Sequence, residues 1–526
     1  EPKVTVGSKE YKAEEIVSGT VDTAKVVTDR AAETTWKQGS NTLDDHNQYR
    51  WITEGGSTSG LATGRSWWGL QDYSTYKLKH GHFDDGDRGL RMGKDEQLYL
   101  TDYYRHTGNK KMFFANTGNT FIIGGENKFT QDNVEYAYYS PKASMEFKES
   151  GNTVVVNGNM SVAGISFKND TENNVLIVNG DLNISGEIFA ESGAEYTIVV
   201  TGKITCKQIT VPENSTLVAS GIDANLDNGA VTVNSLGTTS GDKNIVNNGD
   251  LRINNNCVVG TVSNSKAGTM YVGGNVAAKS DFTNNNKVKI IGNLTVGDNI
   301  KNTPDSGSKP VLQIGGYALC SYFNNRGEFR CGGDLCATGN ANFSSDSYTI
   351  AGTVGYPSDS SKSMGTIYQN GVLYVTTGDM KTSGSLQVGG TVYVKNGSID
   401  TGRDMIAYSN ALIYVNKNMN VGGKLTLQGS KVYVGNSVKA DDLATSAGTE
   451  IHFKNLNVSF TWENLPGSKV YVSGDISSYR IINSGIIYVN PWSLIGTGTA
   501  TIRYLHNNSG AEFICNGNLE VTSYDM

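Results

Sequence analysis

Short apolar runs separated by polar turns recur along most of the chain. In Val175–Gly186 an apolar run of four residues is followed by an Asn-Gly turn, a second short run and a glycine. The run Lys469–Val472 alternates, with valine at every second position and lysine or tyrosine between them. A period of two places the valines on one face of a strand and the polar residues on the other. The pattern predicts short β-strands with a buried face, joined by tight turns.

The turn itself recurs from about residue 146 to the last residues of the chain. Copies lie roughly 17 to 26 residues apart, and wider gaps hide degenerate copies, so that about 17 copies fit. They include Asn157–Met160, Asn179–Leu182, Asn248–Leu251, Gly332–Leu335, Thr377–Met380, Ser473–Ile476 and Asn516–Leu519. A near-constant period of this length indicates a repeat architecture.

One such repeat cannot bury its apolar face alone, whereas stacked repeats can. The sequence therefore predicts an all-β fold, a right-handed parallel β-helix (a solenoid) of about 17 coils. At a strand spacing of ~4.8 Å this would be a rod of roughly 80 Å. Glycine at the corner supplies positive φ, and asparagine beside it can pair its amide from coil to coil. An array of antiparallel sandwiches is the competing fold, because Asn-Gly turns also suit hairpins.

Composition divides the chain into three predicted regions. Residues 1–35 are rich in Ala, Glu and Lys and predict an N-terminal arm or linker. Lys12 to Arg30 could form one or two short amphipathic elements, or the arm could pack against a partner subunit. Residues 36–145 are rich in Trp, Tyr and His and predict an irregular β region that caps the solenoid or binds a ligand. Residues 146–526 are the predicted parallel β-helix.

Charge and hydropathy exclude some classes of protein. The formal net charge is −7 and the sequence pI about 5.5, which argues against nucleic acid as a partner because such proteins carry a basic stripe. No run of about 18 apolar residues exists, so no transmembrane segment is expected. The sequence starts at Glu1, which resembles a processed or truncated start, so an upstream anchor or leader could precede it.

The six cysteines are too few for a disulfide scaffold. Cys331 and Cys515 occupy a position that Val or Ile fills in other repeats, which predicts small buried side chains. Cys320 and Cys336 fall at similar points of neighbouring repeats, so a disulfide between them is an alternative. The spacing of Cys331 and Cys336 does not match the tighter pairs of zinc sites.

The repeats resemble those of known bacterial proteins. The runs Val178–Leu182, Ile291–Val296 and Cys515–Leu519 are similar to the strand-turn-strand repeats of bacterial surface β-solenoids. Bactofilin-like polymer-forming proteins and β-helix proteins associated with type IV pili, such as the cellulose-adhering tapirins, have repeats of this kind. The resemblance covers residues 146–526 and concerns the repeat alone. It implies an extracellular or cell-surface location and carries over no functional residue.

An aromatic group within residues 36–145 is the candidate carbohydrate site. It consists of Trp67, Trp68, Tyr73 and Tyr76. Flat sugar faces stack on aromatic rings, so an exposed row of such residues would hold a polysaccharide chain. The alternative is that these rings form the core of a small cap, because large aromatic side chains are usually buried.

An acidic loop in the same region is the candidate metal site. Asp84, Asp85 and Asp87 offer the hard oxygen ligands that Ca²⁺ prefers. The glutamate that completes an EF-hand loop is missing, and a solvated acidic turn is the alternative. His80 and His82 alone do not make a transition-metal site. No other cofactor is expected.

Catalytic signatures are weak, and we expect no catalytic residue. The chain has no G-x-S-x-G motif. The recurrent acids of the turns, such as Asp181 and Asp379, are better explained as turn residues. A polysaccharide lyase or glycosidase is the alternative function, and Arg326, Arg330 and Asp334 come closest to the charged group that a lyase needs.

The sequence therefore predicts a structural or adhesive protein of a bacterial surface that is not an enzyme. It would either assemble end to end with other copies into filaments or bind polysaccharide. The filament form rests on the repeat pattern, which continues almost to Met526 and would leave an open strand edge.

Overall fold

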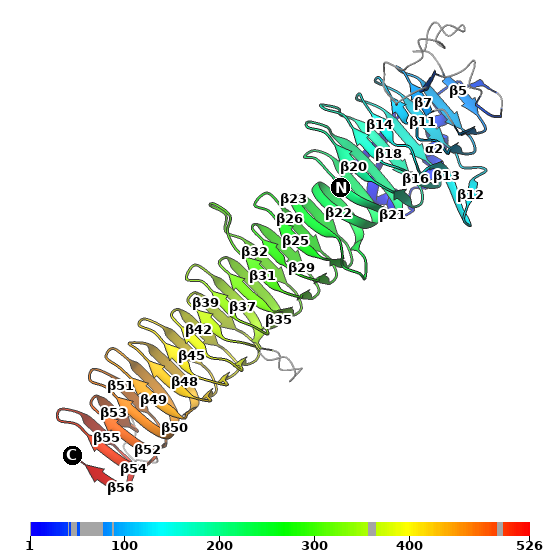
Figure 1. Cartoon of the computed structure of the whole chain (residues 1–526). Coiled ribbons are helices and arrows are strands. Elements are labelled where there is room, and N and C mark those ends of the chain that lie inside the picture. Colours follow the sequence, from blue (N-terminus) through cyan, green and yellow to red (C-terminus); the bar gives the residue numbers. More distant parts are fainter. Residues whose placement is uncertain are drawn as a thin grey trace. The chain divides into compact units, whose positions relative to one another are not determined.

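The computed structural model describes residues 2–39, 41–43, 50–52, 77–86, 89–355, 364–491 and 498–525. Over these residues the chain is all-β, apart from two short helices, and is built of stacked parallel coils (Figure 1). This confirms the predicted solenoid, but with about 22 turns instead of about 17. The chain forms two compact units, residues 1–274 (unit 1) and 275–526 (unit 2).

Each coil contains three short strands. In one coil of unit 1 these are β18 (Asn174–Val178), β19 (Leu182–Ile184) and β20 (Glu187–Ala190). Every strand pairs in parallel with its equivalent in the next coil, so that Leu176 lies beside Ile198. The inward residue Val178 is fully buried, and Gly180 turns the corner with φ +137°, a conformation that side chains disfavour.

The first strands of the coils form one face of each unit. In unit 1 they are β5 (Lys77–His80), β8 (Gln97–Leu100), β11 (Thr120–Ile123), β15 (Thr153–Val156), β18, parts of β21 (Tyr196–Thr210), β22 (Thr216–Gly237) and β23 (Asn244–Ile253), and β26 (Thr269–Val272). In unit 2 they are β29 (Lys287–Ile290), β32 (Val311–Ile314), the starts of β35 (Glu328–Ala337) and β37 (Tyr348–Val354), β39 (Val372–Val375), β42 (Thr391–Val394), β45 (Leu412–Val415), the starts of β48 (Lys431–Ala440) and β50 (Glu450–Asn464), β51 (Lys469–Val472), β53 (Ile486–Val489) and β55 (Glu512–Cys515).

The second and third strands form the other two faces. Those of unit 1 include β6 (Phe83–Asp85), β7 (Gly89–Met92), β9 (Tyr104–His106), β10 (Met112–Phe114), β13 (Val134–Ser140), β14 (Met145–Phe147), β16 (Asn159–Val162), β17 (Ile165–Phe167), β19, β20, β24 (Cys257–Val259) and β25 (Thr261–Asn264). Those of unit 2 include β27 (Val276–Ala278), β28 (Phe282–Asn284), β30 (Leu294–Val296), β31 (Asn299–Asn302), β33 (Ala318–Cys320), β34 (Tyr322–Asn325), β36 (Ala341–Phe343), β38 (Ile367–Gln369), β40 (Met380–Thr382), β41 (Leu386–Val388), β43 (Ile399–Thr401), β44 (Met405–Ala407), β46 (Met419–Val421), β47 (Lys424–Leu427), β49 (Asp442–Thr445), β52 (Ile476–Asn483), β54 (Thr499–Asn507) and β56 (Asn518–Asp525).

Parallel coils already occupy much of the region predicted as an irregular cap. Strand β11 pairs in parallel with β8 on one side and β15 on the other. Tyr104 and Tyr138 are fully buried and stack with ring centroids 4.6 Å apart. These aromatic residues are therefore core. Strand β12 (Phe129–Gln131) pairs antiparallel with β13, and β3 (Lys37–Gln38) and β4 (Arg50–Ile52) join the same sheet.

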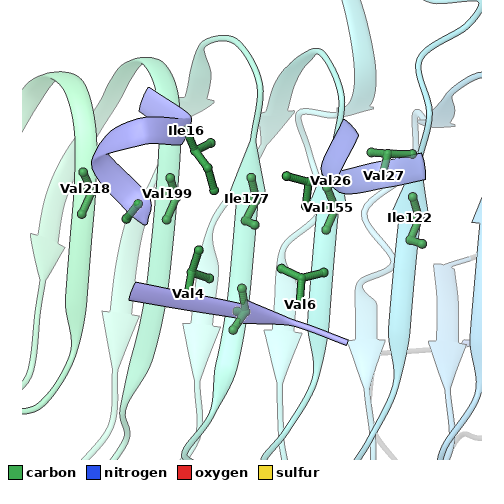
Figure 2. Close-up of a cluster of buried hydrophobic side chains, with 12 residues drawn as sticks. Val4, Val6, Ile16, Val26, Val27, Ile122, Val155, Ile177, Val199 and Val218 are labelled. Atoms are coloured by element: carbon green, nitrogen blue, oxygen red, sulfur yellow. The ribbon is translucent and has the colours of Figure 1, made fainter. Parts of the chain in front are cut away.

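An N-terminal segment, residues 3–32, packs on the outer face of the first strands of unit 1 (Figure 2). It consists of the antiparallel pair β1 (Lys3–Val6) and β2 (Lys9–Lys12), followed by α1 (Ala13–Val17) and α2 (Thr23–Ala32). Its apolar side chains Val4, Val6, Ala13, Ile16, Val26 and Val27 contact Ile122, Val155, Val175, Ile177, Val199 and Val218 of the coils. Asp22 caps the N-terminus of helix α2, and its carboxylate accepts a hydrogen bond from the amide of Ala24.

A polar contact joins the N-terminal segment to the coils, and others hold the segment together internally. The Arg30 guanidinium donates a hydrogen bond to the Thr120 hydroxyl at 3.0 Å. Asp29 accepts hydrogen bonds from Lys25 at 2.7 Å and from the Tyr11 hydroxyl at 3.0 Å. The lysine contact is the largest cause that lowers the pKa of Asp29 to about 2. Burial, and then the Asp29 contact, raise the pKa of Tyr11 to about 12.

The inner side of the third strands changes its chemistry along the chain. In unit 1, Phe114, Phe147 and Phe167 stack there, with centroids 4.7–4.8 Å apart. Later coils replace them with buried asparagines, whose side-chain amides hydrogen-bond from coil to coil. These ladders are Asn228–Asn247–Asn264 in unit 1 and Asn284–Asn302–Asn325 and Asn464–Asn483–Asn507 in unit 2. The amide pairing predicted for the corner asparagines is seen between Asn179 and Asn157, at 2.8 Å. The buried ladders are a further finding, and they satisfy polar groups that burial removes from water.

All six cysteines are free thiols in this structure. Five are buried, and of the two for which the repeat predicted burial, Cys331 is buried whereas Cys515 is half-buried. Cys320 is not bonded to Cys336; its Sγ lies 3.8 Å from the carbonyl oxygen of that residue. Burial raises the pKa of Cys257 to about 12, so this thiol has no tendency to ionise near neutral pH. Over the described ranges, no helix has the length and apolarity needed to cross a membrane.

Candidate functional site: a tyrosine ladder

The predicted aromatic site cannot be placed in the structure. Trp67, Trp68, Tyr73 and Tyr76 lie outside the described residues. The prediction that they bind polysaccharide stays a prediction.

The predicted metal site is placed in part. Asp87 is outside the described residues, whereas Asp84 and Asp85 belong to β6. The Asp84 carboxylate accepts a hydrogen bond at 2.5 Å from Arg105 in the next coil, and this ion pair competes with a metal ion. Within the part of the chain that the structure describes, no three His, Cys, Asp or Glu side chains are grouped to hold a metal. Calcium binding stays a prediction.

The described structure instead shows an exposed aromatic column on unit 2, the tyrosine ladder. It comes from the third residue of successive first strands, β39 to β53, which pair in parallel register. Tyr348 of β37 extends it by one ring contact. The members are Tyr348, Tyr374, Tyr393, Tyr414, Tyr433, His452, Tyr471 and Tyr488.

Strand alternation explains the ladder. In Lys469–Val472 the two valines are buried, whereas Tyr471 points outward and stays partly exposed. The same pattern holds in Thr391–Val394 and Leu412–Val415. Because parallel strands pair residue for residue, an outward tyrosine in each coil lies directly beside the one in the next. The sequence showed the alternation but not the shared register.

In the later half of the ladder the rings stack face to face. The Tyr433 and His452 centroids are 5.1 Å apart with planes 7° from parallel. His452 and Tyr471 are 4.6 Å apart at 6°, and Tyr471 and Tyr488 are 5.0 Å apart at 6°. Each ring face is therefore covered by its neighbour, and ring edges remain for contact with a ligand.

In the earlier half most ring pairs are tilted, although Tyr393 and Tyr414 stack with centroids 5.2 Å apart and planes at 21°. Tyr348 and Tyr374 are 5.9 Å apart with planes at 54°, and Tyr374 and Tyr393 are 5.6 Å apart at 52°. Tyr414 is the most exposed residue of the ladder, at 46%. Tilted rings leave part of each π face open, so this half is where a sugar ring can stack.

A second outward column runs beside the ladder, two residues earlier in each strand. It includes Lys431, Glu450 and Lys469, which pair in register. The Glu450 carboxylate lies 2.9 Å from His452 Nε2. That hydrogen bond is the largest cause that lowers the pKa of Glu450. Charges of alternating sign therefore flank the stacked half of the ladder.

A second aromatic group lies on unit 1, within the aromatic-rich region. Tyr103 stacks on His82 at 5.0 Å, and Phe129 of the hairpin packs on Tyr139 at 4.9 Å. The Arg105 guanidinium lies 4.8 Å from the Phe129 centroid. These side chains are half-buried and hold the β12–β13 hairpin against the coils.

The charged residues considered for catalysis serve the turns. Asp181 accepts a hydrogen bond from the amide of Lys203 at 2.9 Å, and Asp379 accepts one from the amide of Ser398 at 2.8 Å. Each of these acids therefore caps the equivalent turn of the next coil. Arg330 donates to Glu328 at 2.5 Å, and Thr353 donates to Asp334. No carboxylate pair in these contacts converges on an open site, although whether the protein is an enzyme stays a prediction.

Comparison with protein family models, with curated proteins and with solved structures finds no match. The chain is a parallel β-solenoid repeat protein by its fold, and its resemblance to bacterial surface solenoids stays a prediction.

Proposed function

We propose that the protein is a structural and adhesive β-solenoid of a bacterial surface, and that it holds a polysaccharide along the tyrosine ladder of unit 2. The observation that carries the proposal is the set of seven aromatic side chains, from Tyr374 to Tyr488, that neighbouring coils place in one outward column. Tyr348, from the adjacent outward position, adds an eighth ring at one end. A soluble protein that needed these rings only for its core would bury them.

The spacing of the ladder suits an extended polymer. Coils repeat at ~4.8 Å, and the ladder rings lie 4.6–6.0 Å apart, which is comparable with the length of one sugar in an extended chain. Each contact with a sugar is weak, but many contacts on one polymer add their free energies. The hydrogen-bonded strands hold the rings in place, so that little ordering entropy is lost on binding.

The two halves of the ladder have different parts in this proposal. Tyr374, Tyr393 and Tyr414 offer ring faces on which the apolar face of a sugar can stack. The stacked half offers ring edges and polar groups for hydrogen bonds, and its rings also stabilise coil packing.

Retention on insoluble polysaccharides tests the proposal. Cellulose, chitin and xylan would be incubated with the wild-type protein and with the variant Tyr374→Thr/Tyr393→Thr/Tyr414→Thr. Threonine keeps the strand preference and removes the ring. We expect the affinity of this variant to fall at least about tenfold, because each ring contact is worth ~0.5–1.5 kcal/mol.

The control variant is Tyr322→Thr/Tyr368→Thr, which removes two exposed tyrosines of unit 2 outside the ladder, 50% and 36% exposed. Its retention should equal that of the wild type. If the ladder variant were retained like the wild type while Trp67→Ala/Trp68→Ala lost its retention, the binding site would lie in residues 36–145. That result would refute binding along the ladder.

The same incubations address the other predicted functions. Release of reducing ends or of unsaturated sugars by the wild-type protein would favour a polysaccharide lyase or glycosidase. Self-assembly into filaments stays a prediction that electron microscopy of the purified protein would check.

A further inference from the structure

A second exposed aromatic group lies on unit 2, away from the ladder. Phe460, Tyr479 and Tyr504 are 57%, 45% and 38% exposed. They lie on β50, β52 and β54, at the corner where the second strand of each coil continues into the third. With the exposed Arg480 and Arg503 they form a group that we name the corner patch.

The register brings these five residues together from three successive coils. Arg480 pairs with Thr461 of the preceding coil and with Tyr504 of the following one. Ser478 pairs with Ile502 in the same register, so Tyr479 lies opposite Arg503. The backbone of all three strands is hydrogen-bonded through the corner, and the patch is therefore a fixed surface.

The rings of the corner patch do not cover each other. Tyr479 and Tyr504 meet edge to face, with centroids 5.3 Å apart and planes at 62°. The Arg503 guanidinium lies 5.1 Å from the Tyr479 centroid and 5.5 Å from that of Tyr504. Such cation–π contacts hold the guanidinium in place while its N–H groups stay available to solvent.

The two arginines also differ from others in the chain. Arg30, Arg105 and Arg330 form ion pairs with carboxylates. Over the described residues, neither Arg480 nor Arg503 has a carboxylate within ion-pair distance. In a chain of net charge −7, two unneutralised guanidinium groups beside three exposed rings form a local positive and aromatic surface.

We propose that the corner patch binds an anionic polysaccharide whose sugars carry carboxylate or sulfate groups. Guanidinium groups bind such oxyanions in a bidentate manner, while the apolar face of the same sugar packs on Tyr479 or Tyr504. Single-stranded nucleic acid shares part of this chemistry but needs a longer basic track along its phosphates, which this acidic chain lacks. The corner patch is thus a site for charged glycans, separate from the ladder.

The test measures affinity by calorimetry or affinity electrophoresis, in the background Tyr374→Thr/Tyr393→Thr/Tyr414→Thr so that the ladder does not contribute. The probes are polygalacturonate, dextran sulfate, a neutral galactan and single-stranded DNA. We expect polygalacturonate or dextran sulfate to bind, more weakly as salt rises, and the galactan not to bind. Which of the two polyanions binds more tightly identifies the charged group.

Two variants then assign the binding to the patch. Arg480→Gln/Arg503→Gln should lower the affinity for the polyanion at least tenfold. Arg326→Gln/Arg330→Gln changes the net charge equally at two exposed arginines of the same unit and should change the affinity less than twofold. Tyr479→Thr/Tyr504→Thr keeps both charges and should still weaken binding several-fold.

Three results would overturn the proposal: equal loss in the two arginine variants, galactan binding as tight as polygalacturonate binding, or DNA binding tighter than either polyanion. Because the ladder tyrosines are removed in every sample, a negative result for the corner patch leaves the ladder proposal intact. A negative result for the ladder likewise leaves the corner-patch proposal intact.

Discussion

The outward position of the first strands has different chemistry in the two units. In the coils of unit 1 that the N-terminal segment covers it is aliphatic, as at Ile177, Val199 and Val218, and the segment buries it. The later coils of unit 1 carry Thr232, Arg252 and Tyr271 at this position. In unit 2 the same position of the strand carries the tyrosine ladder, as at Tyr414 and Tyr471, which stays open to solvent. The inward positions, by contrast, are apolar in both units.

This difference shows which part of the sequence the fold dictates. Stacked coils require apolar residues inside but allow many kinds of residue outside. An aliphatic outer column is stable only where another segment removes it from water, at about 1.5–3 kcal/mol for each fully buried side chain. Tyrosine tolerates water through its hydroxyl group, so a tyrosine column can remain uncovered and bind a ligand.

The largest expected effect comes from uncoupling the N-terminal segment. Ile16→Asp places an unpaired charge in the apolar contact, and we expect the docking of residues 3–32 to weaken by at least about 3 kcal/mol. Amide hydrogen exchange of α1, α2 and the covered strands measures this. The control Val246→Asp changes an exposed valine of unit 1, 42% exposed, and should leave the exchange unchanged. Slow exchange in α1 of the Ile16→Asp variant would contradict the view that the aliphatic outer residues of unit 1 hold the N-terminal segment.

Substitution of a ladder asparagine should destabilise both units to a similar extent. Asn247→Ala and Asn302→Ala each remove hydrogen bonds between buried side chains, and we expect each to cost about 1–3 kcal/mol locally. Hydrogen exchange in the adjacent coils reports this, with Asn420→Ala on the exposed surface as the control. A large cost in one unit and none in the other would mean that the units differ inside as well as outside.

Loss of one ring of the tyrosine ladder should destabilise the protein less than loss of a buried asparagine. Tyr471→Val removes stacking with His452 and Tyr488, and we expect a loss of about 0.5–1.5 kcal/mol in unit 2. Denaturant unfolding monitored by tyrosine fluorescence measures it, next to Tyr322→Val as the matched exposed tyrosine. An unchanged midpoint would show that the ladder contributes nothing to coil packing, and would leave ligand binding as its only proposed use.

The smallest effect concerns pH. The pKa of Asp29 is lowered to about 2, from about 3.9 in an unfolded chain. A lowered carboxyl pKa stabilises the folded state above the unfolded value, and this contribution is lost as pH falls through the folded one. Because Tyr11 and Lys25, the partners of Asp29, lie in the N-terminal segment itself, the internal packing of the segment should persist at pH 5 and loosen between about pH 4 and pH 2. The exchange of α2 amides measures this, and Asp29→Asn should remove the dependence.

Much of the fold could be predicted, because its signals are local. Alternation in Lys469–Val472 and the Asn-Gly turn at Asn179 specify a strand and a corner, and both are confirmed. The coil number was underestimated for a physical reason. Strand β22 continues through its corners without a copy of the turn motif, and the coils before residue 146 also lack it.

The candidate site was harder to predict, because it depends on register. Tyr433 and Tyr471 could be placed on an outer face, but coils of unequal length hide that they share one column, which only the pairing reveals. The aliphatic outer residues that the N-terminal segment covers did leave a signal in the sequence. The unbroken run Val175–Val178 indicates a strand buried on both faces, and Ile177 is indeed fully buried under the N-terminal segment.

The asparagine ladders have a consequence for how such a chain can change in evolution. An asparagine that pairs with an identical asparagine above and below finds the same partner if one whole coil is added or removed between them. A duplication or deletion that respects the coil boundaries therefore preserves the interior, whereas one that cuts a coil shifts every residue to the wrong face. The number of coils is thus an inherited length that gene duplication can lengthen or shorten one step at a time.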